Sequence, residues 1–200
     1  MKGVGEVRDI PGKKSSELME DRNRYIPKAI ANITPIFVSE ANGALIRDVD
    51  GNDYLDFVGG IGVLNIGHRN EGVVTALKDQ IEKYMHLCFH VTMYEPYVEL
   101  AEKLTEITPG SFPKQVIFTN SGAECVENAI KVARRHTGRS GIIAFENAFH
   151  GRTFLAMSLT SQVKYYKFGF GPLVPGVQRL PFAYCYRCPF KLNYPDCGLE

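Results

Sequence analysis

Hydrophobic positions near the start of the chain alternate with polar ones in a way that predicts a β-hairpin. Two alternating segments, residues 44–49 and 54–58, flank a tight loop at residues 50–52 that contains a glycine. Before them, a polar arm from Gly3 to Lys14 leads into a short predicted helix. Ser15 or Ser16 is expected to cap that helix, which runs to about Tyr25 and is followed by Pro27.

Apolar residues at helical spacing predict two further helices. The first spans about residues 70–85, because Val73, Leu77 and Ile81 fall on one face. The second begins at Glu95, where the following proline suits a first helical turn, and it ends at Pro109. A stretch dense in glycine, residues 59–68, precedes these helices and by itself favours a connecting loop.

The next segment predicts a strand, a helix and a second strand. Residues 116–119 and 142–145 are short apolar runs suited to buried strands. The helix between them ends at Gly138, a residue that suits a left-handed C-terminus. Its predicted buried face carries Val126, Ala129, Ile130 and Ala133. Such a unit predicts parallel strands with a right-handed crossover, so the expected fold class is α/β.

Two clusters follow these strands, at the sheet edge where ligands gather in open parallel sheets. The first consists of Ser121, Gly122 and Ala123, small residues that open a helix and leave backbone N–H groups free. Together with the helix dipole, these groups suit a phosphate. An ordinary helix cap made by the Ser121 side chain explains the same residues, and on spacing alone it is the simpler interpretation.

The second cluster contains Phe149, His150 and Arg152. Phe149 could cover the face of a planar cofactor, and Arg152 could hold a substrate carboxylate through a two-pronged hydrogen bond. His150 is expected to support the cofactor by hydrogen bonding, because no neighbouring residue offers a nucleophile for it to activate. A structural alternative places Phe149 in the core and Arg152 in a salt bridge.

Composition narrows the class of protein. The chain has 200 residues, 44% hydrophobic and 22% charged, and a formal charge of +1, so nothing favours nucleic acid or an acidic membrane as partner. The start carries no apolar run typical of a signal peptide, and no stretch approaches the roughly 20 apolar residues needed to span a bilayer. We expect a cytoplasmic protein.

Five cysteines, an odd number, argue against a disulfide framework. Cys185, Cys188 and Cys197 have the spacing C-x₂-C-x₈-C, and three thiolates could be zinc ligands with a fourth group. Without a fourth ligand we favour a surface insertion stabilised by aromatic packing, and we expect no metal site. Cys88 and Cys125 are expected to be buried thiols.

Taken together, these pieces resemble the class III aminotransferases, the family of 4-aminobutyrate, acetylornithine and ornithine aminotransferases. The resemblance covers about residues 43–181. Its elements are the hairpin, the glycine stretch with Gly67 and His68, the 118–124 and 149–153 motifs, and Phe170, Gly171, Pro172 and Pro175. It implies the fold type I of pyridoxal-phosphate-dependent transferases, in which helices flank a sheet rich in parallel strands.

The resemblance also implies roles for individual residues. Ser121, Gly122 and Ala123 would bind the phosphate of pyridoxal 5'-phosphate, and Phe149 would stack on its ring with His150 in support. Arg152 would bind a substrate carboxylate, and Ile61 would line the substrate pocket. The implied activity moves an amino group from a 4-aminobutyrate-like or other ω-amino donor to a 2-oxo acid such as 2-oxoglutarate, in a homodimer.

The family's catalytic lysine lies downstream of these motifs, and Lys164, Lys167 and Lys191 do not match its motif. We therefore assign no catalytic residue and expect the chain to be an N-terminal portion. Residues 1–65 would belong to the small domain and residues 66–200 to the first part of the large cofactor-binding domain. Since a sheet cut there would expose apolar surface, we expect this polypeptide to be inactive and insoluble or molten by itself.

Two other functions fit the sequence. Amino-acid racemisation would use the same cofactor and the same first step, and some archaeal relatives that racemise carry a similar cysteine segment. A catalytically inert fragment that only binds or assembles would explain the missing lysine. Intact motifs favour transamination over both.

Overall fold

The computed structural model describes residues 10–198, and its contacts divide the chain into two compact units, Met1–Tyr94 and Glu95–Glu200. Each unit is described by itself. The predicted arm from Gly3 lies mostly outside the described residues, and its last two residues, Lys13 and Lys14, are helical instead. The domain boundary expected near residue 65 stays a prediction.

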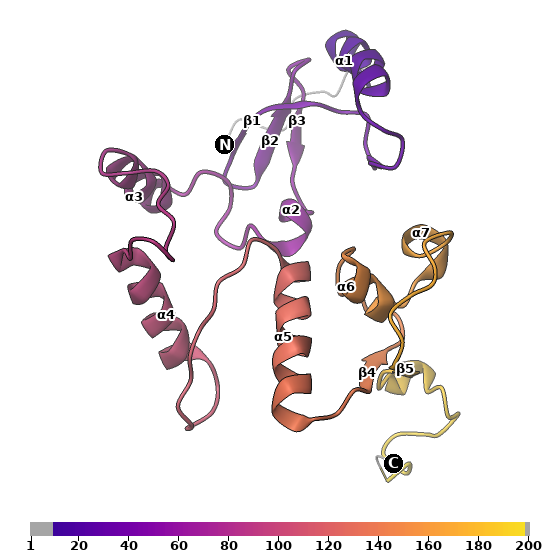
Figure 1. The fold of residues 1–200 in the computed structure, drawn as a ribbon. Helices are drawn as coiled ribbons and strands as arrows, with labels where there is room; N and C mark the ends of the chain where they lie inside the picture. Colours follow the sequence, from indigo (N-terminus) through magenta and orange to yellow (C-terminus); the bar gives the residue numbers. More distant parts are fainter. Residues whose placement is uncertain (1–9, 199–200) are drawn as a thin grey trace. The chain divides into compact units, whose positions relative to one another are not determined.

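The first unit contains a three-stranded antiparallel meander in the order β1-β2-β3 (Figure 1). The predicted hairpin is confirmed as β2 (Leu45–Asp48) and β3 (Asp53–Leu55), joined by the tight loop. The sequence analysis missed β1 (Val38–Asn42), which pairs with β2 and is irregular between Val38 and Glu40.

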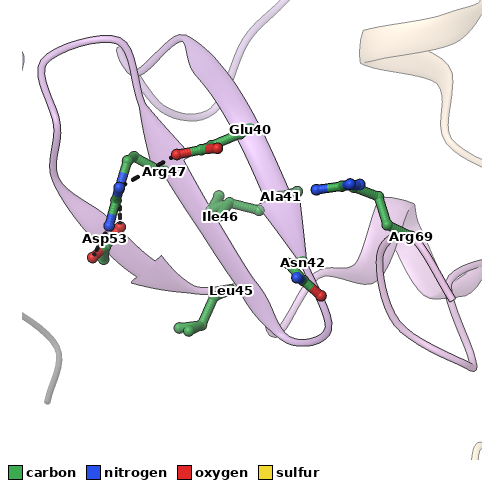
Figure 2. Close-up of a pocket in the computed structure, with 8 residues that line it drawn as sticks. All are labelled: Glu40, Ala41, Asn42, Leu45, Ile46, Arg47, Asp53 and Arg69. Atoms are coloured by element: carbon green, nitrogen blue, oxygen red, sulfur yellow. Dashed lines mark hydrogen bonds and ion pairs between the residues drawn. The ribbon is translucent and has the colours of Figure 1, made fainter. Parts of the chain in front are cut away.

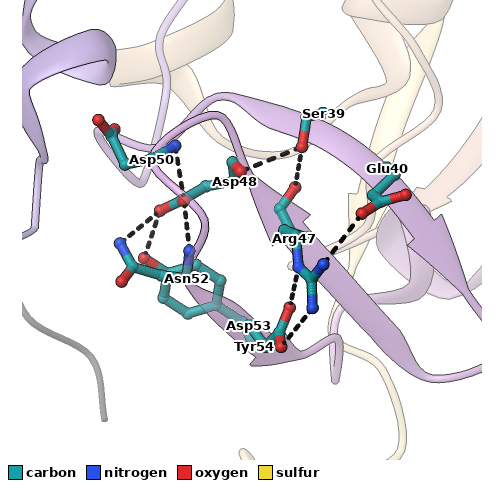
Figure 3. A network of polar contacts seen from close by, with 8 residues as sticks. All are labelled: Ser39, Glu40, Arg47, Asp48, Asp50, Asn52, Asp53 and Tyr54. Carbon is teal, nitrogen blue, oxygen red and sulfur yellow. Dashed lines mark hydrogen bonds and ion pairs between the residues drawn. The ribbon is translucent and has the colours of Figure 1, made fainter. Parts of the chain in front are cut away.

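The hairpin loop is held by the carboxylate of Asp48, which is 2% exposed (Figure 3). It accepts hydrogen bonds from the backbone N–H groups of Asp50 (2.9 Å) and Asn52 (2.8 Å) and from the hydroxyl of Tyr54 (2.8 Å). Burial by itself would raise the pKa of Asp48, but hydrogen bonds from Asn52 and Tyr54 outweigh it and hold the pKa below its usual range. A buried charge is therefore satisfied inside one tight loop.

Three short helical segments complete the first unit. The N-terminal helix α1 (Lys13–Tyr25) begins after Gly12, so the expected cap by Ser15 or Ser16 is wrong, and Ser15 lies inside the first turn. The predicted helix at residues 70–85 is confirmed as α3 (Glu71–Ile81), which Asn70 caps by accepting from two backbone N–H groups. Between them, α2 (Gly59–Gly62) is a single turn with left-handed backbone angles.

The second unit contains α4 (Glu95–Ile107), α5 (Gly122–Thr137), α6 (Phe154–Leu159), α7 (Val163–Tyr166), β4 (Ile142–Phe145), β5 (Val177–Leu180) and the 3₁₀ turn η1 (Cys185–Arg187) (Figure 1). The helices predicted from residues 95 and 120 are confirmed as α4 and α5. Gly138 ends α5 in the left-handed conformation, as expected, with φ 68°.

The parallel strand pair of the second unit differs from the one predicted. β4 is confirmed, but it pairs in parallel with β5, through a connection that contains α6 and α7. Residues 116–119 form no strand, because none of the described strands lies beside them to complete a ladder. Instead the N–H of Phe118 donates to the Tyr97 hydroxyl on α4, and the two rings meet edge to face at 4.6 Å.

A small core joins α5, α6 and the two strands. Ile130, Ala144 and Leu159 are buried together, and Val126, Ile142, Leu155 and Val177 pack against them. The predicted buried face of α5 is therefore correct at Ile130 and Val126 and wrong at Ala129 and Ala133, which are exposed. Within residues 10–198, no helix has the length and apolar character that a membrane span requires.

Candidate functional site

A hollow of about 610 Å³ lies between the start of α5 and the loop that precedes α6. Five of the predicted site residues line it: Gly122, Ala123, Phe149, His150 and Arg152. Val126, Gly151 and Thr153 line it as well and were not predicted as site residues. The two motifs are thus brought together by the fold, although 25 residues or more separate them along the chain.

One wall of the hollow is the first turn of α5. The Ser121 side chain accepts from the N–H of Glu124 (3.2 Å), and the Glu124 carboxylate accepts from the N–H of Asn120 (2.6 Å). These bonds confirm the helix-cap interpretation of Ser121, which is not among the lining residues. They leave the N–H groups of Gly122 and Ala123 without acceptors inside the helix, and the Ser121 hydroxyl keeps a hydrogen that it can donate.

The opposite wall is the loop at residues 149–153. The buried Thr160 hydroxyl accepts from the N–H of His150 (2.9 Å) and bonds to the carbonyl of Gly151 (3.0 Å). Gly151 has φ 118° and sits so close to α5 that a Cβ there would lie 2.7 Å from the Cβ of Ala123. Only glycine fits this approach, which explains a residue that sequence spacing left without a role.

Both distinctive side chains of this loop are exposed. Phe149 is 56% exposed and touches the ring of Tyr166 with centroids 5.1 Å apart, so the alternative that placed it in the core is wrong. Arg152 is exposed and has no ion pair within residues 10–198, so the salt-bridge alternative finds no support there. The hollow consequently offers amide donors without an acceptor among residues 10–198 on one wall, and an aromatic face and a guanidinium on the other.

Ile61 belongs to the first unit and is described separately from this hollow. It is 88% exposed and lies in the left-handed turn α2 with φ 62° and ψ 51°. A β-branched residue is rarely found there, and such strain is typical of functional sites. Nearby, the Asp56 carboxylate accepts from the N–H of Gly59 (2.9 Å) and meets the His68 ring at 2.7 Å, which together hold the pKa of Asp56 below its usual range.

A second hollow, of about 220 Å³, lies on the meander of the first unit (Figure 2). Its charges pair across the strands: Arg47 bonds to Asp53 at 2.6 and 2.9 Å and to Glu40 at 3.3 Å. The bond to Asp53 is the main cause that raises the pKa of Arg47 above its ordinary value. This exposed ladder aligns neighbouring strands and presents no group suited to catalysis.

The three C-terminal cysteines line one hollow of about 390 Å³ together with Phe145, Phe182 and Phe190. Cys185 is exposed, and Cys188 and Cys197 are partly buried. Over the part of the chain that is described, no group of three or more His, Cys, Asp or Glu side chains is placed to hold a metal ion. The expectation that Cys88 and Cys125 are buried is wrong, since both are exposed.

The sequence is similar to that of a known protein family. The family model described as "Aminotransferase class-III" matches residues 25–200. A probable 4-aminobutyrate aminotransferase from Bacillus subtilis (strain 168) is 47% identical over 189 residues, which is 93% of this chain and 43% of that protein. The chain therefore spans less than half the length of this curated relative.

Solved structures show the same fold. An (S)-enantioselective omega-transaminase from Thermomicrobium roseum superposes with a TM-score of 0.76 and 31% identity, over 86% of this chain and 41% of that one. A taurine:2-oxoglutarate aminotransferase from Bifidobacterium kashiwanohense, solved with PLP and glutamate, gives 0.77 and 27%, over 86% and 39%. The α/β fold is thus that of fold type I transaminases, and the chain belongs to the class III aminotransferases.

Proposed function

We propose that the protein containing this chain is a pyridoxal-phosphate-dependent aminotransferase that moves an amino group from an ω-amino donor such as 4-aminobutyrate to a 2-oxo acid such as 2-oxoglutarate. The observation that carries this proposal is the single hollow shared by the α5 turn and the 149–153 loop. Support comes from the B. subtilis relative, which is described as a probable 4-aminobutyrate aminotransferase.

The residues around the hollow fit this cofactor. The free N–H groups of Gly122 and Ala123 and the Ser121 hydroxyl are donors at the start of a 16-residue helix, which suits a phosphate. On the other wall, the exposed ring of Phe149 can cover a planar pyridine, with His150 beside it. When bound, the cofactor supplies an electron sink for the carbanion formed at the substrate.

The chain's own residues then have defined tasks. Ser121, Gly122 and Ala123 would hold the phosphate, Phe149 would cover one face of the ring, and Arg152 would bind and orient a substrate carboxylate with a charge-assisted pair. Ile61 is proposed as a further residue that contacts the substrate. The group that removes and returns the proton is not assigned to any residue of this chain.

The test is made on the protein encoded at the native locus, measured for binding of pyridoxal phosphate and for glutamate formation from 4-aminobutyrate and 2-oxoglutarate. Replacement of Arg152 by lysine should raise the KM for 2-oxoglutarate at least tenfold, because a point charge loses the two-pronged geometry. An unchanged KM would remove that role from Arg152. If the protein instead interconverts amino-acid enantiomers in the absence of a 2-oxo acid, racemisation replaces transamination as the proposed function.

Three further parts of the proposal concern the whole protein. It is a homodimer, it is cytoplasmic, and the boundary between its small and large domains lies near residue 65. The dimer is tested by sedimentation of the native protein, where a monomer at micromolar concentration would exclude it.

A further inference from the structure

The carboxylate of Glu127, on α5, holds the end of the 149–153 loop and the first turn of α6. Its Oε1 accepts three hydrogen bonds, from the Thr153 hydroxyl (2.7 Å), the N–H of Leu155 (3.1 Å) and the N–H of Ala156 (3.3 Å). The three donors lie 26 to 29 residues away along the chain. Glu127 does not line the hollow, and no family motif quoted above includes it.

Glu127 and Ala123 lie four residues apart on α5 and therefore on the same helical face. A Cβ on Gly151 would lie 2.7 Å from the Cβ of Ala123, so the loop lies close against α5 there. The loop therefore lies against α5 immediately before Arg152 and is hydrogen-bonded to α5 immediately after it, at Thr153. Arg152 itself forms no ion pair with Glu127 within the described residues, so its guanidinium stays available.

We propose that Glu127 is a positioning residue that sets where Arg152 and Phe149 stand relative to the Ser121–Ala123 turn. This inference rests on the proposed function and deepens it. The acceptor, Glu127, lies on the same helix as the proposed phosphate-binding turn. It fixes the loop that carries Phe149 and Arg152. A shift of the loop would therefore separate substrate from cofactor without removing either binding group.

The experiment uses the full-length protein and three variants. Glu127→Ala removes the acceptor, Glu127→Gln keeps an acceptor oxygen without the charge, and Glu99→Ala is the matched control on an exposed face of α4. With Glu127→Ala we expect the KM for 2-oxoglutarate to rise about tenfold while kcat changes by less than about threefold, the pattern of lost ground-state binding. Glu127→Gln should bring the KM for 2-oxoglutarate close to the wild-type value. Glu99→Ala should leave both the KM and kcat at their wild-type values.

A second readout needs neither cofactor nor turnover. Hydrogen exchange on the cofactor-free protein should show faster exchange at the amides of Leu155 and Ala156 in Glu127→Ala, by about tenfold, with little change in Glu127→Gln. If Glu127→Ala fails to fold, Glu127→Asp, whose carboxylate is one methylene shorter, replaces it with the same expected directions.

The outcomes separate the two proposals. A wild-type protein that neither binds pyridoxal phosphate nor transaminates would overturn the proposed function and this inference with it. An active wild type with an unaltered KM in Glu127→Ala would overturn the inference alone. A lower melting temperature with normal KM values would make Glu127 merely structural, and that also overturns the inference.

Discussion

The carboxylate of Asp50 accepts hydrogen bonds from both the backbone N–H (3.0 Å) and the hydroxyl (2.5 Å) of Ser15, 35 residues earlier in the chain. It also accepts from the N–H of Lys14 (2.8 Å), so the hairpin loop supplies the cap for α1 that Gly12 cannot provide. The Ser15 hydroxyl is the main cause that holds the pKa of Asp50 below its usual range. This long-range cap joins the N-terminal helix to the meander.

Acid should release this cap. Because the folded pKa of Asp50 is depressed, the unfolded chain binds more protons below about pH 4, and stability is lost as the pH falls through the folded pKa. We expect Asp50→Asn to lower the exchange protection of the α1 amides at neutral pH. The difference from the wild type should disappear in acid. A difference that persists unchanged at low pH would show that Asp50 does not act through its charge.

Substitution of Gly151 should damage the candidate site and the fold together. Gly151→Ala places a Cβ 2.7 Å from that of Ala123 at φ 118°, so we expect a loss of about 2 kcal/mol or more in the free energy of unfolding. Gly141→Ala is the control, since a Cβ there meets nothing within 4 Å. Urea unfolding of the full-length protein measures the loss of free energy of unfolding in both variants. Equal losses would contradict the close approach of Gly151 to Ala123.

Ile61 should contribute strain rather than stability. Its left-handed conformation costs about 1–2 kcal/mol, whereas glycine would lose about 0.5–1 kcal/mol through chain entropy. We therefore expect Ile61→Gly to leave the free energy of unfolding unchanged or slightly raised, and to alter the KM for the amino donor. The control is Ile66→Gly, at an exposed position without positive φ, which should destabilise. Marked destabilisation by Ile61→Gly would show that the side chain packs.

The 200-residue polypeptide by itself should lack fixed packing. Ile143 and Phe145 on β4 and Leu180 on β5 are exposed, as are Val73, Leu77 and Ile81 on α3. Apolar surface of this extent favours a molten or aggregated state. We expect binding of a hydrophobic dye and a weak near-ultraviolet dichroism signal. A single sharp, cooperative unfolding transition of a monodisperse sample would contradict this.

Local signals in the sequence predicted much of the fold because their physical causes are local. The loop at residues 50–52 turns the hairpin with the help of Asp48, four residues or fewer away. Ser121 and Gly138 bound α5 through contacts within one helical turn. For the candidate site, local signals indicated only residue types suited to a phosphate and to a carboxylate, and by themselves they favoured an ordinary helix cap at Ser121; the proposed roles came from the family resemblance.

The tertiary structure decided what depends on partners distant in the sequence. Residues 116–119 have the composition of a strand but form none, since a strand requires a neighbour and pattern does not supply one. Likewise, the cap of α1 comes from Asp50 and the anchor of the 149–153 loop from Glu127, neither of which has a local signature. The sequence thus determined which chemical groups are present, and folding determined which of them meet, because contacts between distant segments depend on packing.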